Sequence, residues 1–350
     1  MEELKGLAEA AGYTVVGSIE QVRRPDPRYQ VGPGKAREIA DLVRKLGAEK
    51  IIFGNELKPV QAYNLAKLSG VEVIDRFQLI LEIFVKRAST KEAKLQIALA
   101  RLNYELAQAK EKVRLAKMGE QPGFLGLGKY QVDIYYEMIR RRIKHIQKEL
   151  RRVRRTRELH RRHRRRLGFP LVSLAGYTNS GKSTLFSSLT RESVPTSSSV
   201  FTTLSTTVRM SSLQGVKVLV TDTVGFIDRL PITLIEAFHS TLEEMVYSDL
   251  ILLVVDVSEP LEEIRRKAEC CLETIRQIGA SKLPMVTALN KIDLIPKGEL
   301  DEKIASLKDV TPNPVPISAL YGINIETLKG EMLRQLEGSL ETVWMSPLAK

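Results

Sequence analysis

The stretch "GYTNSGKS" (residues 176–183) lies between the apolar run "LVSLA" and the helix-forming run "STLFSSLT". A GxxxxGKS pattern between a strand and a helix is the sequence of a phosphate-binding P-loop in an α/β domain. Its glycines let backbone N–H groups curl around phosphate oxygens, Lys182 supplies positive charge to the β- and γ-phosphates, and the Ser183 hydroxyl can bind Mg²⁺. We expect nucleotide contacts from Gly176, Tyr177, Thr178, Asn179, Ser180, Gly181, Lys182, Ser183 and Thr184.

A second candidate phosphate contact ends the buried run "VKVLVTDTVG" (residues 216–225), about forty residues after the P-loop. In P-loop proteins a carboxylate at the end of such a strand holds Mg²⁺. We therefore predict that Asp222 holds the metal through water, beside Ser183, and that the Gly225 N–H contacts the γ-phosphate. Lys182 and Gly225 are predicted catalytic residues.

The base is indicated by "NKID" (residues 290–293), which follows the apolar run "PMVTAL". The Asp293 carboxylate can accept both N1–H and N2–H of guanine, whereas adenine offers no such pair of donors. Asn290 would tie the base to the P-loop, and the Lys291 stem would lie over the purine. In "ISAL" (residues 317–320), Ser318 and Ala319 fit the last base-binding loop, with the Ala319 N–H directed to guanine O6. The sequence therefore predicts GTP and GDP as ligands.

Between the P-loop and DxxG, the stretch "SVPTSSSVFTTLSTTVRM" (residues 193–210) is rich in Ser and Thr without a helical or strand period. One threonine of such a loop is expected to close on Mg²⁺ when the γ-phosphate is present. We assign this catalytic and metal-binding role to Thr203, with Thr202 as the alternative. After the glycine of DxxG stands Phe226, where Ras-like enzymes usually carry a Gln that positions the attacking water, so we expect slow intrinsic turnover.

Residues 1–88 alternate short apolar runs with helical stretches. The runs "YTVVGSI" (residues 13–19), "KIIFG" (residues 50–54) and "VEVID" (residues 71–75) have the composition of strands, and helical runs that end at Gly separate them. The order βαβαβ predicts a small parallel sheet covered by helices. Because "VGPGK" (residues 31–35) lacks the spacing of a P-loop, we interpret it as the turn that opens a helix.

Residues 89–167 predict an antiparallel helical hairpin. Apolar residues recur at alternating spacings of four and three on both sides of a break, the pattern of coiled-coil seams. The break is "KMGEQPGFLGLGK" (residues 117–129), whose proline and glycines cannot continue a helix. At ~1.5 Å per residue each arm would be about 40 Å long. The seams are Leu95, Leu99, Leu102, Leu106, Ala109, Val113 and Ala116 in the first arm, and Ile139, Ile143, Ile146, Leu150 and Val153 in the second.

The second arm concentrates the positive charge of the chain. The 350 residues have a formal net charge of +12, and residues 140–166 hold 13 Arg and two Lys against two Glu, so the remainder is close to neutral. A local basic face of this density is typical of a site for a polyanion, either RNA or an anionic membrane. The alternative is a solvated or acid-paired helix face. The candidate RNA-binding residues are Arg151, Arg152, Arg154, Arg155, Arg161, Arg162, Arg164 and Arg165.

Cysteine content and hydropathy indicate the cellular compartment. Cys270 and Cys271 are adjacent without metal-binding spacing, so we interpret them as ordinary buried thiols. The first 13 residues lack the apolar core of a signal peptide, and the longest apolar run, "LILLVVDV" (residues 250–257), is too short to span a bilayer. We expect a cytoplasmic protein, with partial association at a membrane surface left open.

The order of P-loop, Ser/Thr loop, DxxG, NKxD and SA resembles that of the translation-factor-like GTPases. "DTVGFIDRLPITLIEAFHSTLEE" (residues 222–244) resembles the switch region of the HflX family of ribosome-associated GTPases. "FTTLSTTVR" (residues 201–209) is similar to that family's switch loop, which is close to FATLDPTTR, and has Ser205 and Thr206 where the family often has Asp and Pro. "YQVGPGKAREI", "VEVIDRFQLILEIFVKRAST" and "EAKLQIALARLNYEL" resemble its N-terminal domain and hairpin. The hairpin tip, "QPGFLGLGKYQ", departs from the family's GGGIGTRGPGE.

The resemblance extends to about residue 337 and implies an α/β protein with a Ras-like P-loop GTPase domain. We expect a small parallel α/β domain over residues 1–88, the hairpin over residues 89–167, the GTPase domain over residues 168–337 and a tail over residues 338–350. The resemblance implies an Mg²⁺-dependent GTPase, here expected to be a monomer, that binds the rRNA of the large ribosomal subunit. In some members it implies ribosome splitting. Two alternatives stay open: an RNA-remodelling NTPase or RNA chaperone, and a membrane-surface GTPase.

Overall fold

The arrangement of the chain is known from a computed structural model. The structure describes residues 2–117, 129–166, 168–190, 207–223, 225–228 and 244–344. Within these ranges, the side chains of residues 110–117, 129–133, 157, 160–166, 297 and 338–344 are not described. The chain divides into two compact units, residues 1–152 and residues 153–350, and each contains its own apolar cores.

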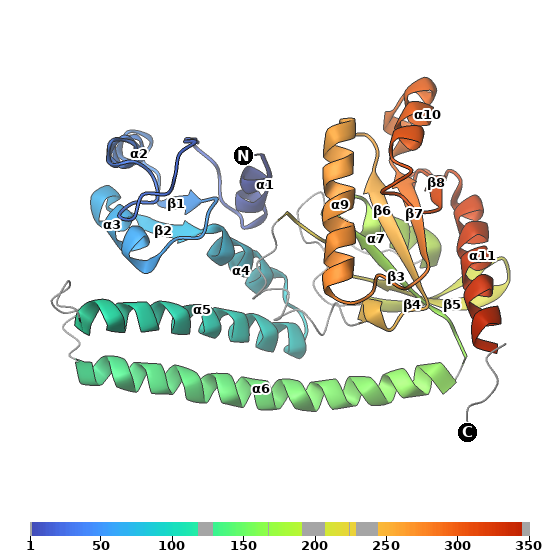
Figure 1. Cartoon of the computed structure of the whole chain (residues 1–350), viewed down its shortest axis with the longest axis horizontal. Helices are drawn as coiled ribbons and strands as arrows, with labels where there is room; N and C mark the ends of the chain where they lie inside the picture. Colours follow the sequence, from blue (N-terminus) through green and yellow to red (C-terminus); the bar gives the residue numbers. More distant parts are fainter. Residues whose placement is uncertain are drawn as a thin grey trace. The chain divides into compact units, whose positions relative to one another are not determined.

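The first unit begins with a small α/β layer built on a two-stranded parallel sheet (Figure 1). Ile51 lies opposite Val73 in this sheet, and Leu65 belongs to the buried core beside it. The second and third helices end at glycines in the left-handed conformation, Gly47 and Gly70, as the sequence predicts. The elements are α1 (Glu2–Ala10), α2 (Pro33–Leu46), β1 (Lys50–Phe53), α3 (Pro59–Ser69), β2 (Glu72–Asp75) and α4 (Arg76–Arg87).

The run at residues 13–19 is not a strand, so the prediction of a third strand there is wrong. Its β-branched residues favour an extended conformation, but no neighbouring strand pairs with it, and Val16 is 54% exposed. The run is held at one end by side-chain contacts. The Tyr13 hydroxyl donates a hydrogen bond to Glu82 at 2.6 Å and accepts one from Lys50 at 2.7 Å. Helix α2 follows the turn at Gly32, as predicted for "VGPGK".

The predicted helical hairpin is formed by α5 (Lys91–Lys117) and α6 (Lys129–Arg166), which lie side by side in Figure 1. The first unit contains α5 and the part of α6 up to Arg152. Lys91 at the start of α5 lies 3.3 Å from Glu149, late in α6, so the two helices are antiparallel. Both predicted seams contribute to one apolar cluster, which contains Leu95, Leu99, Leu102, Leu106, Ile139, Ile143, Ile146 and Leu150. The predicted tip, residues 118–128, lies outside the described residues.

The second unit is built on a six-stranded sheet in the order β4-β5-β3-β6-β7-β8, with β4 antiparallel to β5 and the other neighbours parallel. Parallel strands present their carboxyl ends at one edge, so the loops after β3, β5, β7 and β8 meet there. The elements are β3 (Leu171–Gly176), α7 (Lys182–Thr190), β4 (Thr207–Leu213), β5 (Val216–Asp222), β6 (Leu250–Asp256), α9 (Leu261–Gln277), β7 (Met285–Asn290), the 3₁₀ helix η2 (Ile292–Leu294), α10 (Lys297–Ser306), β8 (Pro314–Pro316) and α11 (Ile325–Trp344).

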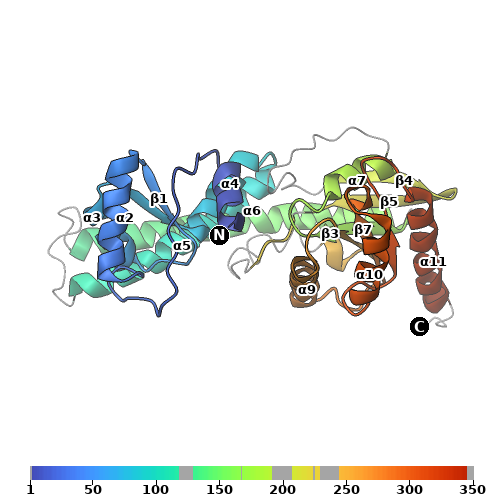
Figure 2. The same ribbon diagram turned by 90° about the horizontal axis from the view of Figure 1, so that it is seen from above.

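Helices cover both faces of this sheet. Strand β6 is buried on both of its sides, which explains why its sequence is apolar throughout. Leu250, Leu252 and Val254 belong to the core under α7 and α11. The alternate residues, Ile251 and Leu253 among them, belong to the core under α9 and α10. Figure 2 shows α9 and α10 on the opposite side of the sheet from α7. A strand buried on both faces lacks the polar alternation of a half-exposed strand, as the run "LILLVVDV" indicates.

Candidate nucleotide-binding site

The P-loop connects the carboxyl end of β3 to the first turn of α7. Gly176 has φ 151°, and a Cβ atom there would lie 2.4 Å from the carbonyl oxygen of Val254. Gly181 has φ 94°, and a Cβ atom there would lie 2.2 Å from Nδ2 of Asn290. Both positions therefore need glycine for conformation and for space. The loop ends at the N-terminus of α7, where unpaired N–H groups and the helix dipole favour an anion.

Lys182 is the first residue of α7 and is 7% exposed. Its Nζ donates hydrogen bonds to the carbonyl oxygens of Gly176 at 3.0 Å and Tyr177 at 2.7 Å. Burial lowers the pKa of this ammonium group to about 8, and the nearby Asp222 carboxylate opposes part of the shift. The predicted phosphate-binding cation is thus buried inside the P-loop, in a site that disfavours its charged form.

The two described candidate metal ligands are brought together by the pairing of β3 with β5. The Ser183 hydroxyl on α7 donates a hydrogen bond to Oδ2 of Asp222 at 3.1 Å, and Asp222 is 1% exposed. A hydroxyl and a carboxylate are the oxygen donors that Mg²⁺ prefers, so this pair fits that ion. The third candidate ligand, Thr203, and its alternative Thr202 lie outside the described residues.

Residues 225–228, which follow Asp222, lie directly against the P-loop. A Cβ atom on Gly225 would lie 3.0 Å from Lys182 Nζ and 3.0 Å from Cγ2 of Thr178, so glycine fits this position closely. Phe226 is 2% exposed and packs in the core under α9. Its N–H donates to the Gly176 carbonyl at 3.0 Å and its carbonyl accepts from the Thr178 N–H at 2.8 Å. The side chain of Phe226 is therefore not in the phosphate site.

Asn290 joins three motifs through its side-chain amide. Its Nδ2 donates to the Ser180 carbonyl in the P-loop at 2.8 Å, and its Oδ1 accepts from the Ala319 N–H at 2.9 Å. The Ala319 N–H thus bonds to Asn290 in this structure, and its contact with guanine O6 stays a prediction. The neighbouring Ser318 is fully buried, and its backbone pairs with Ile323 across the loop.

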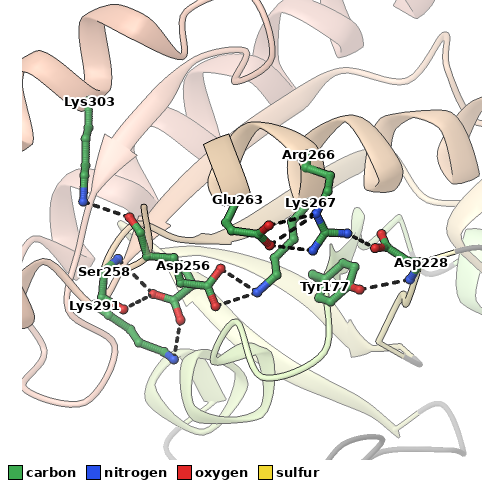
Figure 3. Close-up of polar contacts among 10 residues, drawn as sticks. Tyr177, Asp228, Asp256, Ser258, Glu263, Arg266, Lys267, Lys291 and Lys303 are labelled. Carbon is green, nitrogen blue, oxygen red and sulfur yellow. Dashed lines mark hydrogen bonds and ion pairs between the residues drawn. The ribbon is translucent and has the colours of Figure 1, made fainter. Parts of the chain in front are cut away.

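The other two residues of the NKxD motif differ in their surroundings. Lys291 has φ 70°, and its Nζ lies 2.5 Å from Oδ2 of Asp256 at the end of β6 (Figure 3). Asp293 lies in η2 with its side chain exposed, and its carboxylate has no hydrogen-bond or ion-pair partner among the described residues. Two acceptor oxygens are therefore available for a ligand at the edge of the sheet.

The remaining P-loop candidates lie on different sides of the loop. Asn179 has φ 63° and is exposed, whereas Ser180 is buried and its hydroxyl has no hydrogen-bond partner among the described residues. Thr184 is half-buried on α7. Asp256, which sequence reasoning did not select, is a further carboxylate at the same edge. Its position at the end of the apolar run "LILLVVDV" was the signal that could have found it.

Neither a His/Cys/Asp/Glu metal site nor a membrane-spanning helix is found among the described residues. Among the residues that the structure describes, no group of three or more His, Cys, Asp or Glu side chains could hold a metal ion. No helix in the described part of the chain combines the length and apolar character that a bilayer span needs. Cys271 is buried, which raises the pKa of its thiol, and Cys270 is half-buried beside it.

A P-loop joined through Asn290 to a base-binding edge, with DxxG beside its lysine, defines the class of P-loop GTPases. Three family models match consecutive parts of the chain: "GTP-binding GTPase N-terminal" over residues 1–85, "GTP-binding GTPase Middle Region" over residues 87–164 and "50S ribosome-binding GTPase" over residues 171–291. The chain belongs to the HflX family of GTPases, as its switch sequence indicated.

The curated relatives carry this family name, and a solved structure of a GTP-binding protein has a similar fold. The chain is 50% identical over 302 residues to GTPase HflX of Thermococcus kodakarensis, covering 86% of this chain and 68% of that one. It is 48% identical to GTPase HflX of Methanocaldococcus jannaschii, covering 98% and 84%. A crystal structure of SsGBP with GDP aligns with TM-score 0.56 and 31% identity over 96% of this chain and 95% of that one. These similarities confirm the predicted GTPase fold and GTP hydrolysis as the activity.

Proposed function

We propose that the protein binds GTP and GDP at the site just described and acts on the ribosome through the basic helix α6. The Asn290 amide carries the nucleotide part of the proposal. It bonds to the P-loop at 2.8 Å and to the SA loop at 2.9 Å, so a base held by Asp293 and phosphates held by Lys182 would share one rigid frame. Guanine is favoured because Asp293 offers two acceptor oxygens.

In the proposed reaction water attacks the γ-phosphate, and GTP is converted to GDP and phosphate. Lys182 leaves the carbonyls of Gly176 and Tyr177 and donates to phosphate oxygens, whose charge keeps its amine protonated. The Gly225 N–H, beside Lys182, donates to the γ-phosphate. Ser183, Asp222 and Thr203 would hold Mg²⁺, which when bound neutralises charge on the β- and γ-phosphates.

The position after Gly225 explains why we propose a slow intrinsic rate. Phe226 is buried in the core under α9 and has no group that could orient the attacking water. We expect a rate nearer that of unassisted Ras, on the order of 10⁻⁴ to 10⁻³ per second. The missing group would come from another part of the chain or from the ribosome.

The ribosomal part of the proposal rests on exposed arginines of α6. Arg151, Arg154 and Arg155 are exposed and make no ion pair with any described residue, whereas Arg152 pairs with Glu149 at 2.7 Å. This is unlike an acid-paired helix face and suits a dense polyanion such as rRNA, where each phosphate contact releases counterions. The side chains of Arg161, Arg162, Arg164 and Arg165 lie outside the described residues.

Two measurements test the proposed function. Displacement of a fluorescent GDP analogue by GDP, ADP and GTP tests the base, and equal competition by ADP would overturn the guanine assignment. Sedimentation with whole ribosomes and with separated small and large subunits, in GDP and in a non-hydrolysable GTP analogue, tests the partner. We expect the protein to pellet with the large subunit and to split whole ribosomes in the GTP state. Pelleting with anionic liposomes instead of subunits would favour a membrane-surface GTPase.

A further inference from the structure

Two consecutive turns of α9 contact the junction between the P-loop and residues 225–228, and Figure 3 shows the first of them. The Arg266 guanidinium pairs with the carboxylate of Asp228. Lys267, the next residue, places its Nζ 5.2 Å from the centre of the Tyr177 ring. One turn further along, the Cys270 thiol lies 3.6 Å from the carbonyl oxygen of Ile227. These contacts come from consecutive turns of one face and reach both sides of the junction.

Residues 225–228 are also bonded to the P-loop itself. Besides the two backbone hydrogen bonds of Phe226, the N–H of Asp228 donates to the Tyr177 hydroxyl at 3.0 Å. Tyr177 is 6% exposed, so its ring is held between the core and Lys267. Asp228 is therefore held at its backbone by the P-loop and at its carboxylate by α9.

The position of residues 225–228 matters because Gly225 lies beside Lys182. A Cβ atom on Gly225 would be 3.0 Å from Lys182 Nζ, so a small shift of the segment changes where the Gly225 N–H points relative to that cation. Donors that are already positioned where charge develops lower the barrier, whereas donors that must be ordered during reaction do not. Holding this segment is thus a means of setting the hydrolysis rate.

We propose that Arg266 is a positioning residue for GTP hydrolysis, which holds residues 225–228 against the P-loop through Asp228. The proposal rests on the phosphate site assigned above and concerns its control. Glu263 keeps the guanidinium in place, because its Oε2 lies 2.6 Å from Nη2 of Arg266 on the same helix. Arg266 touches no phosphate in this assignment, so its effect should fall on the rate of the chemical step.

The first experiment is single-turnover hydrolysis with Arg266→Ala in saturating excess over GTP, with GDP affinity measured on the same protein. The ion pair is partly exposed, with 41% of the Arg266 and 26% of the Asp228 side chain accessible, so a moderate effect is expected. We expect the rate constant to fall about three- to fivefold, which corresponds to about 1 kcal/mol, and the GDP affinity to stay within about twofold.

Three further variants separate positioning from general stability. Arg266→Lys should recover part of the rate because it keeps the charge. Asp228→Asn should reproduce the loss, and combining it with Arg266→Ala should add nothing further. Arg265→Ala is the matched control, because Arg265 is the adjacent residue and pairs with Asp309 at 2.5 Å, away from the P-loop. Its rate should equal that of the wild type.

The outcomes are distinct. A wild type that binds GDP, with Arg266→Ala hydrolysing at the wild-type rate, overturns the positioning role and leaves the nucleotide site intact. Equal losses in Arg265→Ala and Arg266→Ala, accompanied by equal falls in melting temperature, overturn it as well, since they show general destabilisation. A wild type that binds no guanine nucleotide overturns the proposed function, and the positioning role fails with it.

Discussion

The buried lysine of the P-loop predicts that nucleotide affinity depends on pH. Burial lowers the pKa of Lys182 from 10.5 to about 8, so the ligand-free protein loses this charge as the pH rises through that value. Bound phosphates favour the protonated amine, so binding above that pH includes uptake of a proton. Because the charged form is the one that binds, GDP affinity should fall about tenfold between about pH 7 and pH 9, equivalent to about 1.4 kcal/mol.

Isothermal titration calorimetry in two buffers of different ionisation enthalpy measures this uptake directly. We expect about half a proton per GDP near pH 8 and close to none near pH 6.5. Lys182→Met lacks the titrating group, so its weaker binding should lose this part of the pH dependence. Ionisation of the guanine N1–H affects both proteins alike. A wild type whose affinity is flat from about pH 7 to pH 9, with no proton uptake, would refute the reasoning.

The lowered pKa of Lys182 also makes the unfolding free energy of the nucleotide-free protein depend on pH. Between about pH 8 and pH 10.5 the unfolded chain binds the Lys182 proton and the folded chain does not, so unfolding free energy rises with pH in that window. Below about pH 8 the folded protein carries the full free-energy cost of burying the charged Lys182 amine. Relative to Lys182→Met, the wild type should gain about 1 kcal/mol between about pH 7 and pH 9 in denaturant unfolding.

Three other predictions follow from the site and from α6. Asp293→Asn should weaken GDP binding and raise the relative affinity for xanthine nucleotides, because the paired acceptor for guanine is lost; an unchanged base preference in competition assays would contradict it. Phe226→Ala should change ribosome-stimulated turnover more than nucleotide affinity, and a loss confined to affinity would contradict that view. Replacing four arginines of α6 with Glu reverses their charge and should weaken ribosome pelleting and flatten its salt dependence, while intrinsic hydrolysis stays nearly unchanged. The four are Arg151, Arg152, Arg154 and Arg155, and pelleting equal to wild type at physiological salt would contradict an rRNA role.

Much of the GTPase domain could be predicted because its signals are local. A P-loop needs a strand, a turn with fixed glycines and a helix in immediate succession, and residues 171–190 contain all three. The hairpin could be predicted for a similar reason, since a repeating spacing identifies the buried face of each helix. Even the partner of Asn290 in the P-loop followed from the order of the motifs, because parallel strands bring their ends to one edge.

What could not be predicted depends on partners distant in sequence. Residues 13–19 have strand composition, but a strand also needs a neighbour with free backbone groups, and composition does not show whether one is present. The hydrogen bond from the Ala319 N–H to Asn290 Oδ1, 2.9 Å long, joins two separate motifs, and neither local sequence shows it. Arg266 and Asp228 are 38 positions apart, and nothing in either local sequence distinguishes them from ordinary surface charges.

Two separate influences on hydrolysis follow from the positions of Phe226 and Arg266. Phe226 is buried, so the free protein has no water-orienting side chain at that position. Arg266 is proposed to hold the Gly225 segment against the P-loop in the isolated protein. If the ribosome supplies the missing group, Arg266→Ala should lower basal and stimulated turnover by the same factor, and the fold stimulation should stay constant. If the ribosome instead acts by holding residues 225–228 in place, stimulated turnover of the variant should return to the wild-type value. The ratio of stimulated to basal turnover, measured for the wild type and for Arg266→Ala in one steady-state assay, therefore distinguishes a supplied catalytic group from ordering of residues 225–228.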